Sequence, residues 1–66
     1  MKIKQGQKLA VQSSRGRYNA IANMDFDTAK DTVYSLIVDQ DRPVEGSFQR
    51  GDTLNESSNG CLITKR

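Results

Sequence analysis

The chain has 66 residues, of which 35% are hydrophobic and 27% are charged, and its net charge is +2. A chain this short forms one small domain with a small core, because it buries only about 60% of the surface that its unfolded form exposes. The single cysteine and the absence of histidine exclude an internal disulfide and an ordinary zinc site, which leaves oligomerisation as the first candidate for extra stability.

Residues 7–13 are predicted to form the first strand, since apolar Leu9 and Val11 alternate with polar neighbours. Residues 13–16, Ser-Ser-Arg-Gly, are typical of a tight turn, because serine hydroxyls bond nearby backbone groups and glycine adopts positive φ at little cost. We expect one domain over residues 1–66 and allow for a flexible segment at residues 1–5.

A second strand is predicted over residues 17–24. Its more apolar row should face the core; the row consists of Tyr18, Ala20, Ala22 and Met24. The small alanines in this row indicate a close neighbour and a sharply curved sheet.

Residues 32–39 favour a third strand because β-branched and aromatic residues dominate them. A helix over residues 29–39 is the alternative, since Thr28 and Asp31 resemble a capping box and several apolar residues also lie at helical spacing. The strand is favoured over this helix because of its β-branched and aromatic content.

The rest of the chain is predicted to contain a short strand at residues 44–49, a turn at residues 50–52 and a C-terminal β-hairpin. Asn59-Gly60 suits a type I′ turn, which needs positive φ at both central positions. In that hairpin the facing pairs would be Ser58 with Cys61, Glu56 with Ile63 and Leu54 with Lys65.

The predicted fold class is therefore all-β, a small single-domain barrel or meander of about five short strands. The layout is similar in architecture to SH3-like or OB-type barrels. This is an analogy of architecture, and no motif of a particular family accompanies it.

Enzyme activity is not expected, because without histidine the usual neutral-pH base and the Ser-His-Asp and Cys-His arrangements are missing. Cys61 is interpreted as a small apolar residue. The carboxylates of Asp25, Asp27 and Asp31 begin like a calcium loop, but the glycine expected at Lys30 is missing and the pattern fails further on. We expect no catalytic residue, metal, cofactor or small-molecule substrate.

The charges are unevenly distributed along the chain. Residues 1–17 hold five basic side chains and no acid, whereas residues 18–41 hold five acids against Lys30 alone. The candidate binding surface that follows from this pattern consists of Lys4, Lys8, Arg15, Arg17, Tyr18, Arg50 and Lys65. For Tyr18 two orientations stay open, one stacking on a base and one packing inward.

Two functions fit this pattern. The favoured one is a protein-interaction or self-assembling module whose segregated charged faces dock on a protein partner or a second copy. The alternative is nucleic-acid binding through the basic N-terminal segment, and the same charges could also pair within one molecule. The sequence shows no signal peptide and no long apolar run, so we expect a cytoplasmic protein with no membrane partner.

Overall fold

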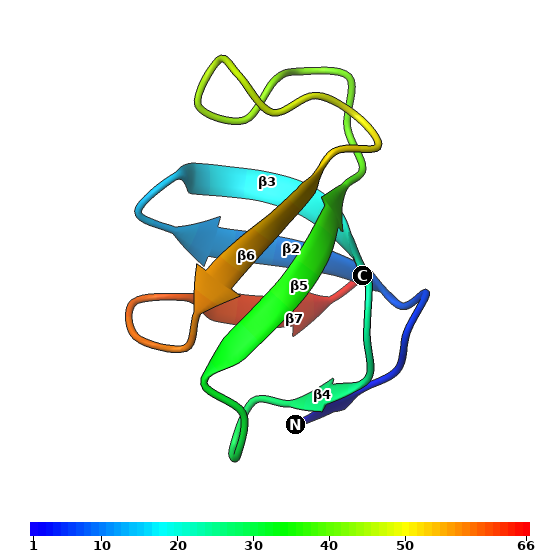
Figure 1. The fold of residues 1–66 in the computed structure, drawn as a ribbon, viewed down its shortest axis with the longest axis vertical. Coiled ribbons are helices and arrows are strands. Elements are labelled where there is room, and N and C mark those ends of the chain that lie inside the picture. Colours follow the sequence, from blue (N-terminus) through cyan, green and yellow to red (C-terminus); the bar gives the residue numbers. More distant parts are fainter.

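The computed structural model describes residues 1–66 and contains seven β-strands and no helix (Figure 1). The strands are β1 (Lys2–Ile3), β2 (Lys8–Ser13), β3 (Gly16–Ala22), β4 (Phe26–Asp27), β5 (Val33–Val38), β6 (Thr53–Ser57) and β7 (Leu62–Lys65). The predicted all-β class is confirmed. No helix in the structure has the length and apolar character needed to cross a membrane.

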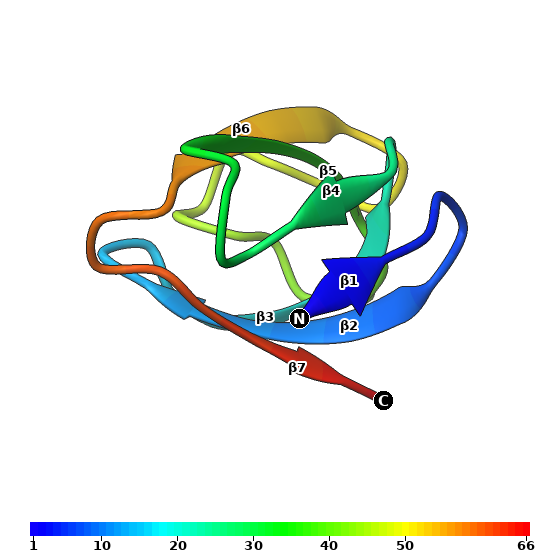
Figure 2. The ribbon, with the colours of Figure 1, turned by 90° about the horizontal axis from the view of Figure 1, so that it is seen from below.

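Five strands form one antiparallel sheet in the order β6-β5-β3-β2-β7, and β1 pairs with β4 in a separate short ribbon. The sheet curls so that β5 and β6 lie over β2, β3 and β7 (Figure 2). It bends at β3, which pairs with β2 along most of its length but with β5 only at Ala20–Ala22. Because β6 and β7 form opposite edges with no ladder between them, the sheet is open and not a closed barrel.

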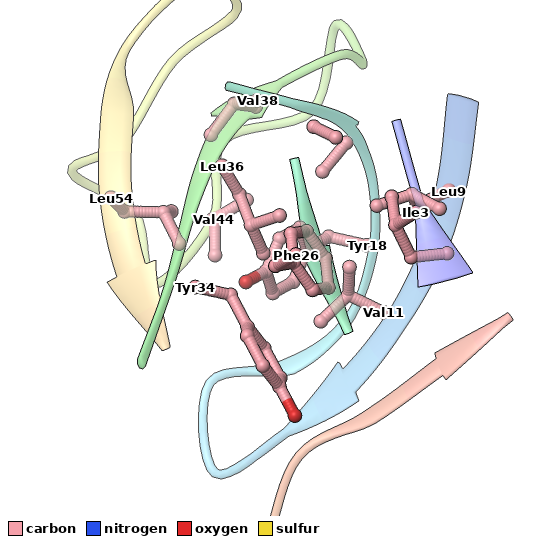
Figure 3. Packing of buried hydrophobic residues seen from close by; sticks show 12 residues of the cluster. Ile3, Leu9, Val11, Tyr18, Phe26, Tyr34, Leu36, Val38, Val44 and Leu54 are labelled. Atoms are coloured by element: carbon pink, nitrogen blue, oxygen red, sulfur yellow. The ribbon is translucent and has the colours of Figure 1, made fainter. Parts of the chain in front are cut away.

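The core lies inside this curl and is built from alternate residues of the strands (Figure 3). The predicted inward positions of β2 and β3 are confirmed, since Leu9, Val11, Tyr18, Ala20 and Ala22 are all buried. Met24, which follows β3, is partly buried. Alanine at the bend allows strands to approach closely, as the sequence indicated. Because successive side chains of a strand point to opposite faces, the residues between these core positions point away from the core.

The strand prediction for residues 32–39 is confirmed over Val33–Val38, and the helical alternative is wrong. Tyr34, Leu36 and Val38 point into the core from this strand (Figure 3). A helix would have placed only one part of this apolar set inward, whereas β5 buries all three and pairs with strands on both sides.

The predicted C-terminal hairpin is wrong. β6 pairs with β5, and β7 pairs with β2, so Glu56 faces Tyr34 and Ile63 faces Val11. Only Gly60 of the Asn-Gly pair has positive φ, at 77°. Tertiary pairing outweighs the local turn preference here, because a hairpin would withdraw Ile63 from its place against the core.

Two consecutive left-handed residues do occur, at Glu45 (φ 55°) and Gly46 (φ 74°). The Ser47 N–H donates to the Val44 carbonyl at 3.1 Å across this turn, and Val44 forms an isolated bridge with Phe48. The predicted strand at residues 44–49 is therefore reduced to one bridge. The turn has the φ signs of type I′, although its sequence, Glu-Gly, did not suggest it.

The β2–β3 turn follows the prediction. Gly16 has φ of 98°, and the Ser13 hydroxyl accepts a hydrogen bond from the Arg15 N–H at 3.1 Å. At residues 1–5, where we allowed for flexibility, β1 pairs with β4 and Ile3 is buried. The ribbon lies between the layer of β5 and β6 and the layer of β2, β3 and β7 in the view of Figure 2.

Candidate functional site

The seven residues of the predicted binding surface fall into two groups. Three of them are committed to contacts inside the molecule: Arg15, Tyr18 and Arg50. The other four are exposed and make no ion pair: Lys4, Lys8, Arg17 and Lys65. The four residues of the second group are therefore the ones that stay available to a partner.

Tyr18 packs inward, so the expectation that it could stack on a base is wrong. Its side chain is buried, and its hydroxyl donates a hydrogen bond to Glu56 Oε2. Burial, followed by the hydrogen bond to Glu56, raises the pKa of Tyr18, so the hydroxyl remains a donor. The Ser13 hydroxyl donates to the same oxygen at 2.8 Å.

Arg15 supports this buried carboxylate from the rim. Its Nε lies 3.5 Å from Glu56 Oε2, and its other nitrogens reach Glu45 at 2.9 Å and the Asn55 carbonyl at 3.5 Å. The guanidinium also lies 5.0 Å from the centroid of the Phe48 ring. These contacts join the β2–β3 turn to β6 and leave Arg15 little freedom to hold a partner.

Arg50 is paired with acids of the loop that follows β5. It contacts Asp39 at 2.7 Å and Asp41 at 3.2 Å. Arg66 also binds Asp39 at 2.7 Å, and this contact is the main reason that the pKa of Asp39 is lowered. Part of the charge segregation seen in the sequence is therefore neutralised within one molecule.

The outward face of β7, β2 and β3 contains a shallow hollow of about 440 Å³, here termed the outer groove. It is lined by Ala10, Gln12, Arg17, Asn19, Leu62 and Thr64, together with Gln40 from the loop after β5. The register places Thr64, Ala10 and Asn19 in one row and Leu62, Gln12 and Arg17 in the next. Ala10, on the central strand, forms the floor of the groove, and its small side chain leaves space above it.

Four polar side chains of the outer groove have no partner within the chain and are available to bind another molecule. Those of Gln12, Arg17, Asn19 and Thr64 make no hydrogen bond or ion pair within the chain, whereas Gln40 is used by the Asn19 N–H and the Arg42 carbonyl. Our sequence analysis missed Gln12, Asn19 and Leu62. The alternation that identified the core residues also predicts that these three side chains lie on the opposite, outward face of the sheet.

The two edges of the sheet differ. The Arg66 N–H bonds the Lys8 carbonyl, and this register directs the backbone groups of Leu62 and Thr64 toward β2 and those of Ile63 and Lys65 outward. At the other edge Arg15 covers the Asn55 carbonyl of β6. The edge of β7 is therefore the more open template for another strand.

The acidic loop has a structural role. Asp25 accepts the Gln5 N–H at 2.7 Å, Asp27 accepts the Ala29 N–H at 2.9 Å, and Asp31 accepts the Asp27 N–H at 2.7 Å. The bond from Ala29 is the main cause of the lowered pKa of Asp27. These carboxylates cap the turns beside β4, and no group of them is arranged to hold a metal ion.

Cys61 is half-buried, and burial raises its pKa to about 11. We expect the thiol to alkylate slowly with iodoacetamide at pH 8 in the folded protein and much faster in urea, because the thiolate is the nucleophile. Equal folded and unfolded alkylation rates would contradict this description.

The raised pKa of Cys61 also makes the free energy of unfolding depend on pH. The stability contributed by the neutral thiol is complete below about pH 9 and is lost as the pH rises toward about 11.

Comparison of the chain with protein-family models, with curated proteins and with solved structures found no match.

Proposed function

We propose that this protein is a non-catalytic interaction module that binds an extended protein segment by strand addition to β7. The observation that carries this proposal is the outward N–H and C=O groups of Ile63 and Lys65 on an edge that no other part of the chain pairs. Main-chain hydrogen bonds would provide affinity, and the neighbouring side chains would provide specificity. The outer groove supports the proposal because it extends this edge with unpartnered polar groups.

Protein is favoured over nucleic acid as the partner because the molecule offers no exposed aromatic platform. Tyr18, Phe26 and Tyr34 are buried, and Phe48 lies beneath Arg15. Sequence-tolerant binding of single strands relies on such rings. The ion pairs of Arg15 and Arg50 also remove two cations from the predicted phosphate-binding set.

Within this proposal, the curled sheet corresponds to a small-barrel architecture of the SH3-like or OB type that is open between β6 and β7. The opening matters for the function, because closure would pair the edge of β7 and leave no site for an incoming strand.

A displayed library of random peptides provides the test. Selected peptides are titrated by fluorescence anisotropy against the wild type and Lys65→Pro, which lacks an outward N–H group at the β7 edge. Lys65→Gln removes the charge but keeps the N–H group, and relative to this variant we expect Lys65→Pro to weaken binding about tenfold, the value of roughly one main-chain hydrogen bond.

Thr53→Pro is the matched control, because it removes an outward N–H group from the opposite edge, on β6. It should bind the selected peptides as the wild type does. Failure to select any peptide, or equal loss of affinity in the two proline variants, would overturn the proposal.

A further inference from the structure

We infer that the segment bound at β7 has acidic residues at the end beside Lys65 and apolar residues at the end beside Leu62. This inference rests on the proposed function and specifies the chemistry of the partner at the same edge. It follows from the side chains that β7 and β2 present on the two faces of the sheet next to the open edge.

The first end is basic on both faces. Lys65 is on β7 itself, one strand spacing of about 4.8 Å from an added strand, and Lys8 projects from β2 at about twice that distance, within reach of an extended lysine. Both are exposed and neither forms an ion pair. β2 and β7 contain no acid, and Asp39 nearby is already held by Arg50 and Arg66.

The second end is apolar on both faces. Leu62 is 65% exposed, the highest value among the large exposed hydrophobic residues of the molecule. Ile63 points to the other face, where it packs against the core but remains half-buried. Apolar residues of an added strand placed beside these two would remove the remaining surface from water.

An antiparallel direction is favoured, because every ladder of this sheet is antiparallel and such pairing is slightly more stable per residue. Since β7 runs from Leu62 to Lys65, the bound segment then begins with its acidic residues and ends with its apolar residues.

A second copy of the chain fits this pattern poorly. In antiparallel pairing of two β7 strands about Ile63, Lys65 would lie beside Cys61 of the other copy and Leu62 beside Thr64. No carboxylate would meet the lysines, so the charges indicate a different protein as the partner.

The test uses three synthetic peptides of equal length: one with acidic residues followed by apolar residues, one with this order reversed, and one with the acids replaced by amides. At low salt we expect the first to bind most tightly. The double variant K8Q/K65Q should lose about fivefold in affinity for it, the value of two partly exposed ion pairs, and should bind the amide peptide as the wild type does.

Lys30→Gln, which makes the same charge change in the loop between β4 and β5, is the control and should have no effect. Equal binding of the acidic and amide peptides, or tighter binding of the reversed peptide, would overturn this inference while strand addition stands. If no peptide of any order binds, or if a labelled single-stranded oligonucleotide binds more tightly than all three, the proposed function itself fails.

Discussion

Replacing Glu56 with alanine is expected to destabilise the protein by about 3 kcal/mol. The side chain is buried, and its Oε2 atom accepts hydrogen bonds from Tyr18 and Ser13 and lies beside Arg15. Its removal would leave the two hydroxyl groups without their acceptor and would take one ion pair from Arg15, which keeps its contacts with Glu45 and Asn55. For a chain of this length the total free energy of unfolding is about 3 to 10 kcal/mol, so the variant should lose at least about a third of it.

Urea denaturation checks this prediction with two matched variants. Glu56→Gln retains an acceptor for Tyr18 and should cost less than the alanine variant. Glu45→Ala removes the exposed partner of Arg15 and should change stability by less than about 0.5 kcal/mol. Equal effects of Glu56→Ala and Glu45→Ala would show that the buried network contributes little.

Phe26→Ala should cost about 3 to 4 kcal/mol, the usual range for removing a buried aromatic side chain. Phe26 is buried, and its ring stacks on Tyr34 with a centroid distance of 4.4 Å and an interplanar angle of 19°. With Ile3 it is one of the two core residues that hold the β1–β4 ribbon against the large sheet (Figure 3). Loss of the ring should therefore loosen the ribbon as well as lower global stability.

Amide hydrogen exchange separates these two effects, because the Thr28 N–H bonds the Met1 carbonyl within the ribbon region. This amide should exchange faster in Phe26→Ala than global unfolding alone explains. Phe48→Ala is the control, since Phe48 is only half-buried and should cost about 1 kcal/mol. A larger loss of stability for Phe48→Ala than for Phe26→Ala would contradict our description of the core.

The core residues could be predicted because the alternation of side chains between two faces depends only on the backbone of the strand itself. Alternation at Leu9 and Val11, and at Tyr34, Leu36 and Val38, predicts which side chains share one face without knowledge of the strand partners, and the structure buries both sets. The turn at Gly16 was predictable for the same reason, since it depends on neighbouring residues alone.

Strand partners were less predictable because they depend on contacts between distant residues. The Asn59-Gly60 signal favours a hairpin, but Glu56 meets Tyr18 and Ser13 while Ile63 pairs with Val11, and these contacts separate β6 from β7.

The ion pairs of the charged residues were also hard to predict, because they too join residues that are distant in the sequence. Arg15 and Glu56 lie far apart in the sequence and come together only in the folded chain. The sequence therefore could not show which cations of the basic segment form internal ion pairs and which stay free. Four basic residues of the predicted binding surface are exposed in the structure: Lys4, Lys8, Arg17 and Lys65. The polar residues of the outer groove carried no signal beyond their outward position.

The most direct test of strand addition is amide hydrogen exchange of β7, measured by NMR before and after a selected peptide is added. In the free protein the Thr64 and Arg66 amides should be protected, because they bond β2, while the Ile63 and Lys65 amides exchange rapidly. The peptide should make the Ile63 and Lys65 amides as slow as their neighbours. Protection of both amides in the free monomer, or rapid exchange at both with the peptide bound, would contradict the account.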